Sequence, residues 1–141
     1  MASITDEKVR GFLEHGTRTG KIGYSATDGR PLTVPVWFVL EADEIVFTTG
    51  GDTAKGVSIG RGPRLAMCVD LEEQPYAFVQ VQGEAMVSEN PDELLRMATV
   101  IAARYVGTER AEEFGRRNGV PGELLVRLRP TRVVAEFDIT A

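Results

Sequence analysis

Residues 19–49 read TGKIGYSATDGRPLTVPVWFVLEADEIVFTT, and this stretch decides the fold. β-branched and aromatic residues are frequent in two segments, Thr19–Ala26 and Pro31–Leu40, which flank a polar turn at Thr27–Arg30. The Asp-Gly pair inside that turn suits the tight connection of an antiparallel hairpin. A third β-rich segment follows at Glu44–Thr49. We therefore expect three consecutive strands arranged as an antiparallel meander.

The rest of the chain alternates single helices with further strands. Helices are expected at 3–15, with Thr5 as its cap, at Ala54–Arg61, from Asn90 through Tyr105, and at Thr108–Asn118; strands are expected at Arg64–Asp70, Tyr76–Ser88, Leu124–Leu128 and Val133–Ile139. Closely spaced antiparallel strands punctuated by single helices indicate an α+β fold built on a β-barrel. A doubly wound parallel sheet would require strict alternation of strand and helix.

Length and composition are those of one ordinary folded domain. The chain has 141 residues, of which 43% are hydrophobic and 26% charged, so residues 1–141 are expected to form a single domain with its own core. The net charge of −5 provides no general positive field for a phosphate backbone. We expect no nucleic-acid partner.

The cysteine content and the residues at the N-terminus indicate the cellular compartment of the protein. Cys68 is the one cysteine, so no internal disulfide forms, and we expect its thiol to be buried and inert. Asp6 and Glu7 stand where a signal peptide would carry basic and then apolar residues, and the longest apolar run, near Val36–Leu40, is too short to cross a bilayer. We expect a cytoplasmic protein with no membrane partner. The spacing around His15 does not resemble a metal site.

A local excess of positive charge marks the segment Gly50–Arg64. The segment contains three cations, Lys55, Arg61 and Arg64, and one acid, Asp52, although the chain as a whole is acidic. Glycines before a helix start let backbone N–H groups turn toward an anion, and Lys55 would add a full charge. The segment predicts a phosphate site. A strand that simply runs into a capped helix has the same pattern, so a structural interpretation stays open.

A second candidate is the tryptophan in the segment Val34–Phe38. Pro35 confines its strand to an edge, a bulge or a place that faces something other than a strand. Trp37 could therefore border a planar ligand. Alternation of core and surface residues explains the same pattern, and Tyr76 allows the same two interpretations.

Taken in order, the short motifs along the chain resemble the pyridoxamine 5′-phosphate oxidase-like split-barrel superfamily. These motifs are Asp28-Gly29-Arg30-Pro31, Pro35-Val36-Trp37-Phe38, Phe47-Thr48-Thr49-Gly50, Lys55, Gly62-Pro63-Arg64, Gly83-Glu84-Ala85 and Arg104-Tyr105. Within it, the chain looks most like the actinobacterial deazaflavin-dependent oxidoreductases that use coenzyme F420 and include biliverdin reductases. The resemblance implies a homodimer of antiparallel split barrels with a cofactor groove at the interface. The chain lacks the extended basic ends of true pyridoxamine phosphate oxidases, so vitamin B6 chemistry is not expected.

The resemblance also implies where the cofactor lies and what it does. Its phosphate would lie near Lys55, its ring near Pro35 to Trp37, and Tyr76 would approach from one rim. The full predicted set is Pro35, Val36, Trp37, Thr48, Thr49, Gly50, Lys55, Arg61 and Tyr76. The expected activity is hydride transfer from reduced F420 to a small unsaturated substrate, such as an enone or a tetrapyrrole. An FMN-dependent oxidoreductase, and a protein that stores or senses the cofactor without turnover, are the alternatives. No catalytic residue is assigned, because Tyr76, Lys55 or water could deliver the proton.

Overall fold

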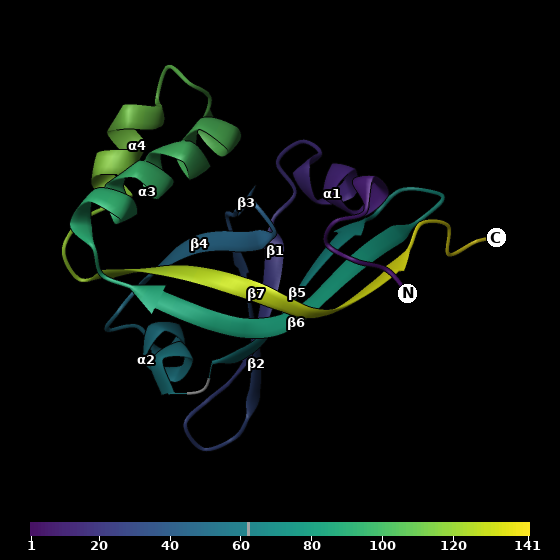
Figure 1. Ribbon diagram of the computed structural model, residues 1–141, viewed down its shortest axis with the longest axis horizontal. Helices are drawn as coiled ribbons and strands as arrows, with labels where there is room; N and C mark the ends of the chain where they lie inside the picture. The colour runs from purple at the N-terminus through teal and green to yellow at the C-terminus, as the bar shows by residue number, and fades with distance from the viewer. Residues whose placement is uncertain (62) are drawn as a thin grey trace.

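The computed structural model describes residues 1–61 and 63–141, which form one antiparallel sheet of seven strands and four helices (Figure 1). The strands are β1 (Gly20–Ser25), β2 (Pro31–Val36), β3 (Val39–Glu41), β4 (Glu44–Gly50), β5 (Arg64–Leu71), β6 (Ala77–Ser88) and β7 (Glu123–Glu136). The helices are α1 (Glu7–Glu14), α2 (Ala54–Arg61), α3 (Pro91–Val106) and α4 (Ala111–Asn118). The expected α+β class and antiparallel sheet are confirmed.

The order of strands differs from the expected meander. The β1–β2 hairpin is present, with Gly29 at φ +90° in its turn, but the other neighbour of β1 is β5. The full order is β2-β1-β5-β6-β7-β4-β3. The expected strand Pro31–Leu40 is broken at Trp37 and Phe38, and its two halves lie at opposite edges of the sheet. These two residues carry the chain from one edge to the other.

The curl of the sheet has a local cause in β6 and β7. Gln82 pairs with Arg132 while Gly83 pairs with Pro130, so Thr131 is an extra residue that forms a bulge. A Cβ atom on Gly83 would overlap the carbonyl oxygen of Arg129, which explains why glycine stands there. The two expected strands Leu124–Leu128 and Val133–Ile139 are therefore one strand. The expectation of two separate strands was wrong because the bulge accommodates Pro130 within one continuous ladder.

Two hydrophobic clusters hold the helices on the sheet. The larger one lies inside the curled sheet and includes Phe38, Phe47 and Met67. In the smaller one, Met97 of α3 packs on Val46 of β4. Figure 1 shows α3 and α4 side by side at one end of the molecule and both termini toward the other. Across residues 1–61 and 63–141, no helix has the length and apolar character needed to span a membrane.

Two local expectations need correction. Asp6, and not Thr5, occupies the N-cap position of α1, and the Thr5 N–H donates to the Ser3 hydroxyl. Cys68 is half-buried rather than fully buried, because β5 turns its side chain toward the less covered face, and this partial burial raises the pKa of its thiol. Gly62, expected to end α2, lies outside the described residues.

Candidate functional site

A cavity of about 310 Å³ lies where the β2–β3 crossover, the end of β4, the start of α2 and helix α3 meet. It brings together seven residues predicted from the sequence: Pro35, Val36, Trp37, Thr48, Thr49, Gly50 and Lys55. They come from three segments that the chain order separates, and the crossover and the β4–β7 pairing place them together. The sequence missed the other lining residues, which are Thr53, Ala98, Ile101, Asn118 and Glu123.

Arg61 and Tyr76 do not line this cavity. Arg61 is exposed in the last turn of α2, well past Lys55. Tyr76 precedes the far end of β6, whereas the near end, Ser88, pairs with Leu125 beside the cavity. Figure 1 shows the β5–β6 connection near the termini and away from α2. Within one chain, Tyr76 therefore cannot reach this cavity.

Thr49 brings an unsatisfied hydroxyl to the cavity. Its side chain is 4% exposed, and its Oγ1 atom has no hydrogen-bond partner among the described residues. A buried polar atom without a partner costs about 1–3 kcal/mol. Thr49 is a lining residue of the cavity, and an orphaned hydroxyl beside a cavity is a group that a polar ligand can satisfy.

Lys55 is the one cation among the described residues that line the cavity. It is the second residue of α2, and α2 approaches β4 so closely that a Cβ atom on Gly56 would overlap the carbonyl oxygen of Gly50. Burial lowers the pKa of Lys55, while the Glu123 carboxylate opposes that shift. The ion pairs of residues 1–61 and 63–141 do not include Lys55. Its charge is available to an anionic ligand.

The backbone contributes less to an anion site than the glycines suggested. The Gly51 N–H donates to the carbonyl oxygen of Gly122 at 2.8 Å, and the Gly56 N–H donates to the Thr53 hydroxyl at 3.0 Å. That hydroxyl donates in turn to the Gly50 carbonyl at 2.7 Å. Thr53 thus caps the helix, which is a common role for threonine. The expectation that glycine N–H groups face a ligand was wrong for these two, and Lys55 is the full positive charge among the described lining residues.

Trp37 is held by aromatic contacts from the helices. Its ring stacks on Tyr105 with centroids 5.0 Å apart and planes 3° apart, and Phe114 lies 6.4 Å away. One face of the indole is therefore covered by protein. Trp37 also borders the cavity. It is therefore both packed against the protein and placed beside the cavity, which were the two interpretations that the sequence left open.

Two side chains of α3, Arg104 and Tyr105, fix the crossover, and we call them the α3 clamp. The Phe38 N–H donates to the Tyr105 hydroxyl at 3.2 Å, and that hydroxyl donates to the Arg18 carbonyl at 2.9 Å. The Arg104 guanidinium donates to the Phe38 carbonyl at 2.7 Å and to the Leu13 carbonyl at 2.7 Å. Because Phe38 lies between strands, these bonds replace the ladder partners that its backbone lacks.

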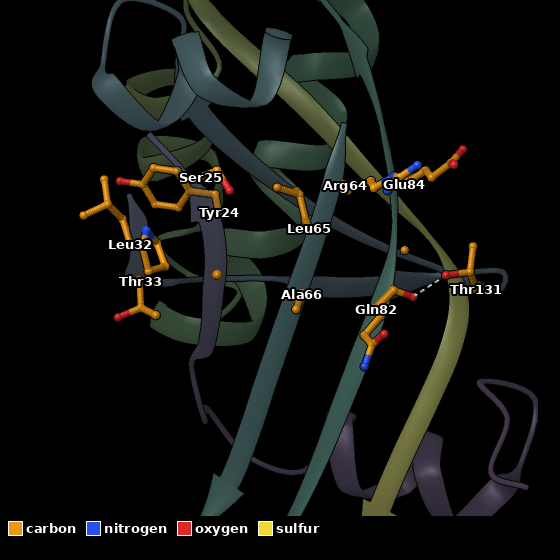
Figure 2. A pocket seen from close by; sticks show the side chains of 13 residues that line it. Tyr24, Ser25, Leu32, Thr33, Arg64, Leu65, Ala66, Gln82, Glu84 and Thr131 are labelled. Atoms are coloured by element: carbon orange, nitrogen blue, oxygen red, sulfur yellow. Dashed lines mark hydrogen bonds between the residues drawn. The ribbon is translucent and has the colours of Figure 1, made fainter. Parts of the chain in front are cut away.

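A larger cavity of about 480 Å³ contains none of the predicted site residues (Figure 2). It lies across β1, β2, β5, β6 and β7. Figure 2 shows Tyr24 and Leu32 on one side and Arg64 and Glu84 on the other, with Thr131 bonded to the Gln82 carbonyl. It is wider and more open than the first cavity, and no unpartnered buried polar atom of the described residues points to a ligand there.

A curled antiparallel sheet whose edge strands are joined by such a crossover defines a split-barrel protein. Residues 5–136 match the family model described as pyridoxamine 5′-phosphate oxidase. The chain belongs to this family. The superfamily resemblance found in the sequence is thereby confirmed.

Solved structures share the fold at low sequence identity. The conserved hypothetical protein Rv2991 from Mycobacterium tuberculosis superposes with a TM-score of 0.80 at 22% identity, over 93% of this chain and 83% of that one. A protein described as an F420 reductase gives 0.72 at 20% identity, over 92% and 98% of the two chains. A heme binding protein from Mycobacterium smegmatis gives 0.74 at 20% identity, over 100% of this chain and 57% of that one. No curated protein has a matching sequence.

The α3 clamp predicts the effect of removing one hydroxyl. Tyr105→Phe leaves the Phe38 N–H unpaired, so the free energy of unfolding should fall by about 1–3 kcal/mol. The stacked ring remains, so the emission of Trp37 should hardly change. Urea unfolding and fluorescence measure both effects. Tyr24→Phe is the matched control, because the Tyr24 hydroxyl has no hydrogen bond within the described residues. Equal stabilities of the two variants would contradict the clamp.

Proposed function

We propose that the 310 Å³ cavity binds coenzyme F420 and that the protein is an F420-dependent reductase of a small unsaturated substrate. The observation that carries the proposal is the unpartnered, buried hydroxyl of Thr49, a residue that lines the same cavity as Lys55 and Trp37. A polar anionic tail and a flat ring are the two chemical features that such a cavity suits. Deazaflavins have both.

The protein's part in the reaction is binding and positioning. Lys55 and Thr49 hold the phosphate end, while Pro35, Val36 and Trp37 border the ring. Thr48 and Gly50 complete the wall between them. The bound deazaflavin supplies the hydride, and the chain supplies orientation and a partly dry environment. The titratable side chains that line the cavity in the described chain are Lys55 and Glu123, so a proton reaches the product from one of these or from water.

FMN is the alternative cofactor, because it too combines a phosphate with a flat tricyclic ring. The similarity to an F420 reductase favours F420, and the family favours a flavin-like ligand in general. The likeness to a heme binding protein favours a second candidate, a protein that stores or senses its ligand without turnover. The turnover experiment below separates these functions.

We propose that two copies of the chain form the working unit. A volume of 310 Å³ is at the lower end for ligand pockets, so a ring with a long tail extends beyond it. Met86 and Val87 of β6 are 53% and 41% exposed, which leaves apolar surface for a second copy. Light scattering at micromolar concentration should give twice the mass of the chain. A monomeric mass would contradict the dimer.

Turnover tests the proposed activity. Reduced F420 should be consumed when an enone or a tetrapyrrole is present and should persist without an acceptor. The absorbance of the oxidised cofactor follows the reaction. Consumption of reduced FMN but not of F420 would assign the FMN alternative. Tight binding of F420 with no reduction of any acceptor in a broad panel would assign storage or sensing.

Thr49→Val should change stability and binding in opposite directions. Replacing an unpartnered buried hydroxyl by a methyl group should raise the free energy of unfolding of the ligand-free protein by about 1 kcal/mol. The same change removes a hydrogen bond to the ligand, so cofactor affinity should fall about threefold to tenfold. Thermal unfolding and fluorescence titration give the two numbers. Thr33→Val, at an exposed position of β2, is the control. Unchanged cofactor affinity would remove Thr49 from the site.

A further inference from the structure

A carboxylate that the sequence did not predict lies beside Lys55. Glu123 is the first residue of β7, and its backbone pairs with Gly50 at the end of β4. A Cβ atom on Gly50 would lie 3.2 Å from Oε2 of Glu123 and 3.4 Å from Oδ1 of Asp52. Both carboxylates therefore lie near Gly50, and Glu123 is the one that lines the cavity together with Lys55.

Neither carboxylate forms a direct ion pair with another side chain of the described residues. The ion pairs of the described residues include neither Glu123 nor Asp52. Burial raises the pKa of Glu123, Lys55 opposes that shift and Asp52 adds to it, as expected for groups that affect one another at short range. The lining of this end of the cavity thus combines one cation, Lys55, with one acid, Glu123, while the exposed Asp52 lies outside the lining. Because Glu123 already offsets the charge of Lys55, a second negative charge on a ligand phosphate gains no net attraction at this end of the cavity.

We propose that Glu123 makes this cavity select a ligand whose phosphate is a phosphodiester over one with a terminal phosphomonoester, and this inference rests on the function proposed above. A phosphomonoester carries a charge of about −1.5 to −2 at pH 7. A phosphodiester has one ionisable oxygen and carries a single charge. The extra charge of the monoester is repelled by the partly buried Glu123 carboxylate, so Lys55 does not compensate for the cost of removing that charge from water.

This selection separates the two candidate cofactors by the chemistry of their tails. The tail of F420 is attached through a phosphodiester, whereas FMN ends in a phosphomonoester. Both have a flat tricyclic ring that can lie near Trp37, so the ring alone discriminates them poorly. Glu123 is therefore a specificity-determining residue, and Lys55 supplies the attraction that both phosphates share.

A series of ligands that differ only at the phosphate tests the proposal. Riboflavin, FMN and the methyl ester of FMN, each with a flavin and with a 5-deazaflavin ring, are titrated into the wild type and Glu123→Gln. The wild type should bind the methyl ester about tenfold more tightly than FMN. Glu123→Gln should bind FMN about tenfold more tightly than the wild type does, the methyl ester about threefold more tightly, and riboflavin with unchanged affinity.

Glu136→Gln is the matched control, because Glu136 is an exposed glutamate at the other end of β7. It should leave all affinities unchanged, and thermal unfolding shows whether each variant is folded. Equal gains for FMN and its methyl ester, or no gain, would overturn the role of Glu123 and leave the proposed function standing. Failure of the wild type to bind any member of either series would overturn the proposed function itself.

Discussion

The site depends on the hydrogen bonds that Tyr105 and Arg104 of helix α3 form with the backbone of Phe38. A chain that crosses from one edge of a sheet to the other leaves the ladder, so its backbone polar groups need new partners. Tyr105 and Arg104 accept and donate those bonds, and Tyr105 also stacks on Trp37. Helix α3 therefore holds the crossover through Phe38, holds Trp37 through the stacked ring of Tyr105, and forms one wall of the cavity.

The cavity next to this crossover is less well satisfied than the rest of the interior. Thr49 buries a hydroxyl without a partner, and burial acts against the charged forms of both Lys55 and Glu123. Each of these features weakens the ligand-free fold, and each is an interaction that a ligand can complete. Unsatisfied and partly buried charged groups that gather in one place are typical of a binding site, where stability is lost for function.

Local chemistry in the sequence was sufficient for the elements and for the centre of the site. The Asp28-Gly29 turn, the Asn90 cap and the step from Thr49 into α2 are encoded within a few residues, and the structure has all three. Long-range pairing was not encoded in this way. No local signal tells that β1 pairs with β5, or that Glu123 faces Lys55, because both depend on how strands 40 or more residues apart align. Tyr76 was placed by resemblance to a dimeric family, and one chain alone does not bring it to the cavity.

The central claim is that Lys55 holds the phosphate of a flavin-like cofactor, and its affinity measured with and without this charge tests the claim directly. Dissociation constants are determined for the wild type, Lys55→Ala and the surface control Lys8→Ala at two salt concentrations. The account predicts a tenfold to hundredfold loss of affinity in Lys55→Ala, equivalent to about 1.5–3 kcal/mol, and a weaker salt dependence than in the wild type. Equal affinities and equal salt dependences in all three proteins would contradict it.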